Sequence, residues 1–195
     1  LLAERGIFVT YESIRQWCNH FRPEYTRALK KRSGRLGNNW YLDEVFIKIQ
    51  GERHYLWRAV DQDGDTIDIL MQKRWNKQAA KRFFRKLLKG QCASPRRMIT
   101  DKLKSYSAAH REVMPSVTHS TKQDENNRAE VSHEPTRQRE RQMRRFKSAG
   151  QAQRLLTVHG EIGNLFRLGR HVIRAIHYRK FRLEAFSKWQ QVTCA

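Results

Sequence analysis

The sequence predicts an α/β fold, in which a mixed five-stranded sheet carries helices on its faces. Three observations lead to this prediction. Residues 40–72 have the composition of three successive strands joined by short turns. Two further short apolar strands follow, and helical patterns separate them from their neighbours. On both sides of this part the chain is helical and rich in Lys and Arg. Such an order of strands and helices is typical of a sheet with both faces covered.

The first strand is expected over residues 40–49. It consists mostly of good strand formers, and a turn follows at 50–52. The strand also carries two acids, Asp43 and Glu44. A carboxylate in a buried strand loses hydration unless it is paired or holds a metal. The alternative is that Asp43 or Glu44 simply faces solvent at a strand edge.

The remaining elements are expected in the following order. Strands at 53–60 and 65–72 flank an Asp-Gly turn at 61–64. A helix at 76–89 repeats apolar residues at helical spacing and ends at Gly90, with Phe83 and Phe84 in the core. A strand at 96–101, a helix at 103–112, a short strand at 115–119 and a long helical region complete the series. This is the order of the ribonuclease H-like fold.

Two more acids stand in similar places. Asp101 ends a short apolar strand, and such positions point into the crevice where α/β proteins bind ligands. Glu130 opens an Arg-rich helical region, in which His133 follows one turn later. Together with Asp43, these acids can converge on a pair of Mg²⁺ ions, because oxygen ligands suit this hard cation. Two ions about 3.5–4 Å apart are a common device of phosphoryl transfer.

Four segments of the chain resemble the DDE transposases of bacterial insertion sequences, most closely the group of insertion-sequence family six. They are Tyr41-Leu42-Asp43-Glu44-Val45-Phe46, Arg53-His54-Tyr55-Leu56-Trp57-Arg58-Ala59-Val60-Asp61, Thr100-Asp101-Lys102 and Asn126-Asn127-Arg128-Ala129-Glu130. The resemblance runs from about Gly6 to the C-terminus. It implies the ribonuclease H-like fold, catalytic and metal-binding roles for Asp43, Asp101 and Glu130, and two Mg²⁺ (or Mn²⁺) ions. Glu125 is a rival for the third acid, since the Gln123-Asp124-Glu125 stretch departs from the family pattern.

The activity implied is cleavage and transfer of DNA strands at insertion-sequence ends. Two alternatives stay open. The chain begins with Leu1 within a helical pattern, so we expect an N-terminal truncation. A truncated, inactive remnant that binds DNA without catalysis is therefore one alternative. The other is a ribonuclease H-like nuclease that acts on RNA–DNA hybrids.

The expected domain organisation has four parts. Residues 1–22 form a partial helix-turn-helix, 23–39 a basic linker, 40–147 the catalytic core, and 148–195 a helical extension that packs on the core. Thr10 can cap a helix over 11–21, whose inner face carries Ile14 and Trp17 or Cys18. The outer side carries Arg15, Gln16 and Asn19, which can read base edges. A plain helical hairpin is the alternative, and the resemblance favours contact with DNA.

The charge balance predicts a polyanionic partner. Lys and Arg number 40 against 19 for Asp and Glu, which gives a formal net charge of +21 and a pI of about 10.6. In a chain with a full set of aromatic residues, this excess is typical of a folded nucleic-acid-binding protein. We expect double-stranded DNA as the partner. Besides the three residues at 15–19, the candidate contacts are Lys48, Lys102, Lys104, Arg137, Arg141, Arg144 and Arg145.

Further expectations concern assembly and location. Two element ends must be held together, so a homodimer or higher oligomer is expected. The chain has no apolar run long enough to span a bilayer and no signal-peptide pattern. Its three cysteines are far apart and indicate a reducing compartment. With the resemblance, this predicts a cytoplasmic, nucleoid-associated bacterial protein.

The acids at 61, 63, 65 and 68 can mimic a calcium loop, but we favour a solvated hairpin tip.

Overall fold

The computed structural model describes residues 3–32, 36–91, 94–122, 125–134, 137–138, 146–168 and 173–193, without the side chains of Ala3, Arg32, Arg128, Glu130 and Ser132. The elements lie in this order: η1 (Ala3–Arg5), α1 (Tyr11–Arg32), β1 (Asn39–Ile49), β2 (Glu52–Asp61), β3 (Thr66–Gln72), α2 (Lys77–Gln91), β4 (Arg97–Thr100), α3 (Lys104–Val113), β5 (Thr118–Ser120), α4 (Asn127–Ser132), α6 (Ala149–Phe166) and α7 (Ala175–Thr193).

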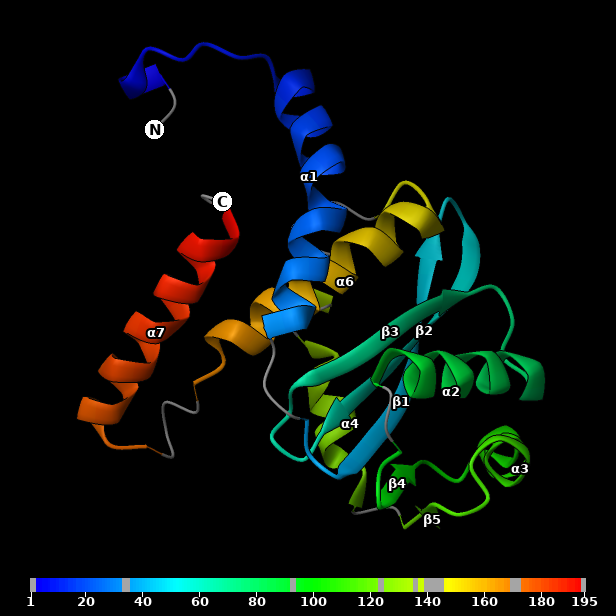
Figure 1. Ribbon diagram of the computed structural model, residues 1–195. Coiled ribbons are helices and arrows are strands. Elements are labelled where there is room, and N and C mark those ends of the chain that lie inside the picture. Colours follow the sequence, from blue (N-terminus) through cyan, green and yellow to red (C-terminus); the bar gives the residue numbers. More distant parts are fainter. Residues whose placement is uncertain are drawn as a thin grey trace.

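The five strands form one mixed sheet with the order β3-β2-β1-β4-β5 (Figure 1). β1, β2 and β3 are antiparallel neighbours, whereas β4 runs parallel to β1 and β5 runs parallel to β4. The predicted sheet is therefore confirmed in strand number and type. β5 begins later than expected, because Val117 N donates to Met114 O in a turn and pairing starts only at Thr118.

The first hairpin is closed by a two-residue turn, Gln50-Gly51, between the paired residues Ile49 and Glu52. Both turn residues have positive φ, 52° and 85°. This backbone suits the right-handed twist of the flanking strands, and glycine adopts it without strain. The turn sets the register that places Glu44 opposite Trp57.

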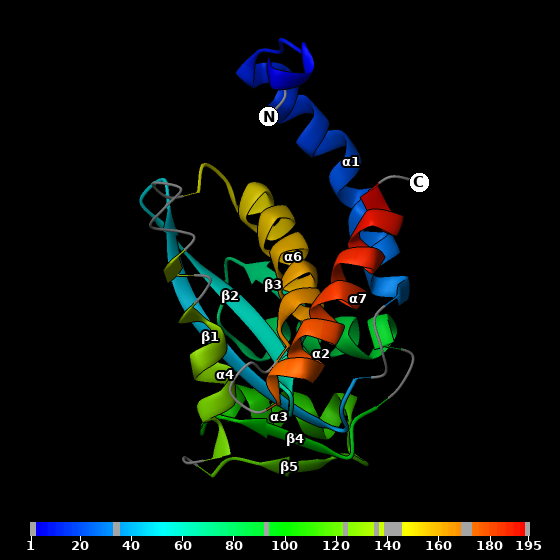
Figure 2. The same ribbon diagram turned by 90° about the vertical axis from the view of Figure 1, so that its left-hand side faces the viewer.

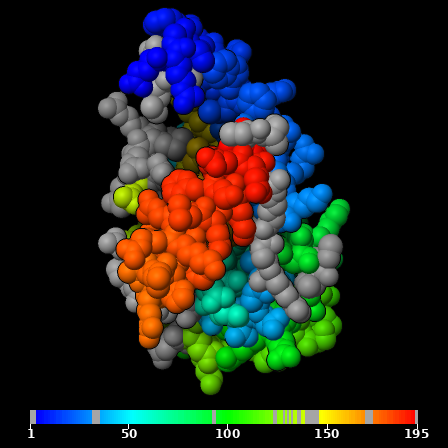
Figure 3. Space-filling view, turned by 60° about the vertical axis from the view of Figure 1, so that its left-hand side comes forward, coloured from blue at the N-terminus to red at the C-terminus, as the bar shows by residue number. Residues whose placement is uncertain are grey.

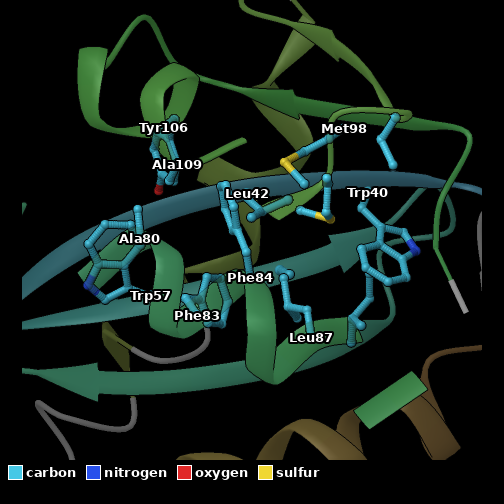
Figure 4. Packing of buried hydrophobic residues seen from close by; sticks show 14 of the residues in the cluster. Trp40, Leu42, Trp57, Ala80, Phe83, Phe84, Leu87, Met98, Tyr106 and Ala109 are labelled. Carbon is cyan, nitrogen blue, oxygen red and sulfur yellow. The ribbon is translucent and has the colours of Figure 1, made fainter. Parts of the chain in front are cut away.

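One face of the sheet packs against α2 and α3. Phe83 and Phe84 of α2 are fully buried there with Trp57 of β2 and Tyr106 of α3 (Figure 4). The indole of Trp57 meets the ring of Tyr106 edge-on, with centroids 5.4 Å apart. The core role predicted for Phe83 and Phe84 is thus confirmed. Gly90 lies inside the last turn of α2, which continues to Gln91.

The opposite face of the sheet is covered by α4 and α6. Its apolar cluster includes Val45, Ile47, Ile49, Leu56, Ile69, Phe146, Ala152 and Leu156. α6 lies over the sheet beside β3, as Figure 2 shows. Asn164 accepts from Thr66 N at 2.7 Å and donates to Thr66 O at 2.8 Å, and Gln153 bonds Met71 N and Ile69 O in the same way. Two amide side chains therefore satisfy the backbone of an edge strand, which otherwise invites pairing with other chains.

α1 is longer than predicted. The Thr10 cap is confirmed, because its Oγ1 accepts from Ser13 N at 3.2 Å. The helix does not end near Phe21 but continues through Pro23 to Arg32, into the part expected as a linker. Its second half is held by tertiary contacts, since Leu29 is buried and Lys30 lies 3.7 Å from Glu161 of α6. The expected inner face, Ile14 with Trp17 or Cys18, is exposed, so that expectation was wrong.

α7 lies on the outside of the molecule, against α1 and α6 (Figure 3). Ala185 and Val192 are its buried residues, and Phe186 approaches Phe166 of α6 with ring centroids 5.1 Å apart. Ile176, by contrast, is 65% exposed. Within the described ranges, no helix combines the length and apolar character needed to cross a membrane.

Candidate active site

The site forms where β4 ends beside β1. The last pair between these parallel strands joins Leu42 and Thr100. Asp43 and Glu44 lie just past this pair on β1, and Asp101 directly follows β4. Carboxylate oxygens of these three residues all lie within 4.8 Å of one another. The structure therefore brings together two of the predicted acids, Asp43 and Asp101, and adds Glu44.

Asp43 is held from the face covered by α4. The Nε2 of His133 lies 3.4 Å from the Oδ2 of Asp43, and the imidazole is only 3% exposed. Burial, with Arg58 and Arg137 nearby, lowers the pKa of His133 to about 3. The ring is therefore neutral at physiological pH, and the contact is not an ion pair. Asn126 fixes the start of α4, because its Nδ2 donates to Leu42 O at 3.0 Å.

Glu44 points to the opposite face. It accepts hydrogen bonds from the hydroxyl of Tyr106 and, at 2.7 Å, from the Nε1 of Trp75. Burial raises the pKa of Glu44, as does the nearby charge of Asp101, although the two donors oppose this shift. The solvent-facing alternative for Glu44 is thus wrong. The sequence offered one indication of this role, since Glu44 directly follows Asp43. However, neighbouring residues of a strand point to opposite faces, so the sequence pattern does not predict that both carboxylates approach Asp101.

Asp101 is fixed by the chain that follows it. Its Oδ1 accepts from Leu103 N at 3.2 Å, just before α3 begins. Thr100 Oγ1 donates to the carbonyl of Asp101 at 2.9 Å. Lys102 and Lys104 are exposed beside the acid. The carboxylate is thus held in position at the carboxyl end of a parallel strand, as predicted.

The third predicted acid, Glu130, lies on α4, which packs against β1 and β2. Its neighbour Ala129 is buried, whereas the side chain of Glu130 lies outside the described part of the structure. The rival Glu125 is engaged elsewhere: it accepts from Arg97 Nη2 at 2.8 Å and from Ser120 Oγ at 2.5 Å. These bonds, that of Ser120 first, lower the pKa of Glu125.

The predicted DNA contacts divide into two groups. Lys48, Lys102, Lys104, Arg15, Gln16, Asn19 and Arg137 are exposed. On α1, Arg15 donates to Glu12 at 2.7 Å and Gln16 donates to the same carboxylate at 3.4 Å. Arg141, Arg144 and Arg145 lie outside the described residues.

The acidic hairpin is not a solvated tip. Asp61 is buried, and its carboxylate accepts backbone N–H bonds from Gly37, Asp63 and Asp65 at 2.9–3.0 Å. Asp68 is buried against Lys86 of α2. The expectation was wrong for these two acids, because Asp61 binds the backbone of its own turn and of Gly37, and Asp68 binds Lys86.

Comparison with known proteins decides the family. Residues 37–168 match the family described as DDE domain. The chain belongs to the DDE transposases of insertion-sequence family six. Over 114 residues it is 33% identical to the transposase for insertion sequence-like element IS431mec of Staphylococcus aureus strain Mu50. This alignment covers 58% of this chain and 50% of the transposase. The chain is 32% identical over the same length to the transposase of IS257 in transposon Tn4003 from S. aureus.

This DDE domain also matches a solved structure of the same fold. The catalytic domain of Mos1 mariner transposase superposes with a TM-score of 0.50 at 13% identity, covering 96% of this chain and 95% of that one. The ribonuclease H-like fold is thereby confirmed. The sequence alignment with the two S. aureus transposases covers about half of their length.

Proposed function

We propose that this DDE domain catalyses metal-dependent cleavage and transfer of DNA strands at the ends of an insertion sequence. One observation carries the proposal: in a member of the DDE transposases, the carboxylates of Asp43, Glu44 and Asp101 meet within 4.8 Å at the carboxyl end of β4. Acids crowded in this way repel one another, which a divalent cation relieves. The reaction class is phosphoryl transfer.

The donor set fits Mg²⁺ or Mn²⁺. All three groups offer oxygen atoms, the ligands that these cations prefer. We assign Asp43, Asp101 and Glu130 as catalytic metal ligands and Glu44 as a further candidate. Two bound ions would supply an activated water or 3′-OH and would neutralise charge at the scissile phosphate. Glu130 fits because its helix packs on the strand that carries Asp43.

The other residues prepare the site for this chemistry. His133 contacts Asp43 from one face of the sheet, and Tyr106 and Trp75 bind Glu44 from the other. Both acids are therefore oriented before substrate arrives, and preorganised charge is the largest single contribution to most enzymatic rates. Lys102 and Lys104 lie next to Asp101 and can hold phosphate oxygens. An in-line displacement at phosphorus requires no covalent intermediate with the protein.

We also propose the context in which the site acts. Residues 40–147 form the catalytic core, and residues 148–195 extend it. Residues 1–22 contact duplex DNA through Arg15, Gln16 and Asn19, and residues 23–39 connect this part to the core. The net charge of +21 suits double-stranded DNA. Because two element ends must be joined, a dimer or higher oligomer in the bacterial cytoplasm, at the nucleoid, is the expected form.

The proposal is tested with a labelled duplex from the DNA that flanks this gene, with Mg²⁺ or Mn²⁺ present. Wild type is compared with Asp43→Asn, Asp101→Asn and, as a matched control, Glu112→Gln, an exposed acid of α3 that pairs with Lys77 and Lys81. We expect metal-dependent cleavage and joining in wild type and control, and none in the two Asn variants. Binding without products would instead indicate a non-catalytic DNA-binding protein. Preferred cleavage of an RNA–DNA hybrid would assign a different nuclease activity.

A further inference from the structure

The β1–β2 hairpin carries a second feature on the face that Glu44 shares. The turn end of this hairpin projects beyond β3, as Figure 1 shows. Three cross-strand pairs follow one another from the core toward the turn: Glu44 with Trp57, Phe46 with Tyr55, and Lys48 with Arg53. Side chains on alternate residues share a face, so these pairs form one continuous strip. Only Trp57 is buried under α2 and α3, and the strip beyond it is aromatic and basic.

Trp75 extends this strip toward the acids. Its indole stacks on Tyr55, with ring centroids 5.9 Å apart and an interplanar angle of 8°. Its Nε1 donates to Glu44 at 2.7 Å. Despite these two contacts, 47% of the side chain is exposed. A large aromatic residue is thus held in place, next to the catalytic carboxylates, with much of its surface open to a ligand.

A basic groove of about 760 Å³ is lined by Arg74 and Asn76, the residues on either side of Trp75 in the sequence. It lies between the end of β3 and the start of α2, and its lining includes Lys73, Arg74, Asn76 and Arg82. None of the described residues that line it is acidic. Lys73 is paired with Glu52 at 3.1 Å, whereas Arg74 and Arg82 make no ion pair within the described residues. Two guanidinium groups with their phosphate-binding donors available therefore line a groove formed by residues that flank Trp75 in the sequence.

Phe46 repeats the same pairing of ring and cation nearer the turn. It is exposed, and the guanidinium of Arg53 lies over its ring, 5.1 Å from the centroid. Lys48, predicted above as a DNA contact, is exposed on the same face. Alternating rings and cations match a nucleic-acid strand, in which bases stack and phosphates carry charge.

We infer that Phe46, Tyr55, Trp75, Arg74 and Arg82, here called the aromatic–basic surface, bind an unpaired DNA strand that leads away from the phosphate at the acids. A base stacks on Trp75, and the backbone contacts Arg74 and Arg82. Unpaired DNA is favoured over duplex, because only a splayed base presents its face to an indole. The position of the strand rests on the proposed function, whereas binding itself does not.

The test measures binding of a fluorescent single-stranded oligonucleotide, and of the blunt duplex of the same sequence, in EDTA, so that no cleavage takes place. The variants are Trp75→Ala, Trp75→Phe and the pair Arg74→Gln/Arg82→Gln. Phe181→Ala, an exposed aromatic residue of α7, and Arg179→Gln, an exposed arginine of the same helix, serve as matched controls. Circular dichroism melts identify any variant that fails to fold.

We expect Trp75→Ala to weaken single-strand binding about 5- to 100-fold, the usual effect of one stacked base, with a much smaller change for the duplex. Trp75→Phe keeps the ring and should retain most of the affinity. Arg74→Gln/Arg82→Gln removes two phosphate contacts. The slope of log K against log salt concentration for the single strand should therefore fall in magnitude by about 1.4. Controls should match wild type.

Equal affinity of Trp75→Ala and Phe181→Ala for the single strand would overturn the inference, as would equal losses for single strand and duplex. Because no metal is present, these results do not depend on the cleavage assay. A failed cleavage assay with intact single-strand binding would remove the proposed activity and leave the surface standing.

Discussion

The imidazole Nε2 of His133 lies 3.4 Å from the carboxylate Oδ2 of Asp43, across the interface between α4 and β1. The ring also lies against the backbone of Asp43, and this contact raises the pKa of His133 against the stronger effect of burial. A buried neutral ring placed against a proposed catalytic acid is suited to hold that acid in position. His133 is thus a positioning residue in our interpretation.

Replacing His133 by Asn should lower the cleavage rate about 10- to 100-fold, the usual effect of losing an outer contact to a metal ligand. The metal concentration for half-maximal rate should rise, which a purely structural role would not produce. The measurement is the initial cleavage rate against Mn²⁺ concentration. His177→Asn, on the exposed side of α7, is the control. An unchanged metal dependence would contradict the assignment.

Two substitutions test whether Glu130 or Glu125 is the third catalytic acid. Glu130→Gln should abolish cleavage and leave DNA binding largely intact, because the charge that it removes is needed only for the metal. Glu125→Gln should retain cleavage, since that carboxylate is bound to Arg97 and Ser120. Parallel cleavage and binding assays check both variants. Cleavage retained by Glu130→Gln and lost in Glu125→Gln would reverse the assignment.

Tyr106→Phe tests the support of Glu44. The substitution removes one donor from a half-buried carboxylate and leaves the aromatic packing with Trp57 and Phe84 in place. We expect a loss of about 1.5–3 kcal/mol in the free energy of unfolding, the range for a hydrogen bond to a charged group. Urea denaturation provides the measurement. Tyr178→Phe, which removes an exposed contact with Arg182, should cost less than 0.5 kcal/mol, as is roughly usual for the surface.

The pH dependence of stability should report Glu161. Burial raises the pKa of this carboxyl group to about 7, against the opposing charge of Lys30. Between the ordinary Glu pKa and about 7, the folded state binds more protons than the unfolded state. Stability is therefore lost as pH rises through this window.

Glu161→Gln lacks this proton and should become more stable relative to wild type as pH rises. The gain between pH 5 and pH 8 should be on the order of 2 kcal/mol. Chemical denaturation at the two pH values measures it. Glu112→Gln should show no such divergence, since this exposed acid has its pKa lowered by Lys77 and Lys81. A constant difference between Glu161→Gln and wild type would disprove the burial argument.

Local pattern was enough to predict much of the catalytic core. Strand-forming residues between 40 and 72 predicted β1, β2 and β3 to within one residue at each end, because alternation and turn chemistry act over a few residues. The helical spacing of Phe83 and Phe84 likewise predicted the face of α2 that the core buries. The same local logic failed where the partner is distant. α1 continues past Phe21, where Leu29 is buried and Lys30 meets Glu161 of α6, more than a hundred residues away.

The sequence by itself therefore determined the order of the elements and placed Asp43 in a strand and Asp101 at the end of another. Only the tertiary structure decided that β4 ends beside Leu42, so that acids on opposite faces of β1 approach Asp101. It also decided that Trp75 lies over Tyr55 and against Glu44. Register and packing between distant segments depend on the sum of many weak contacts, whereas strand and helix patterns arise from neighbouring residues alone.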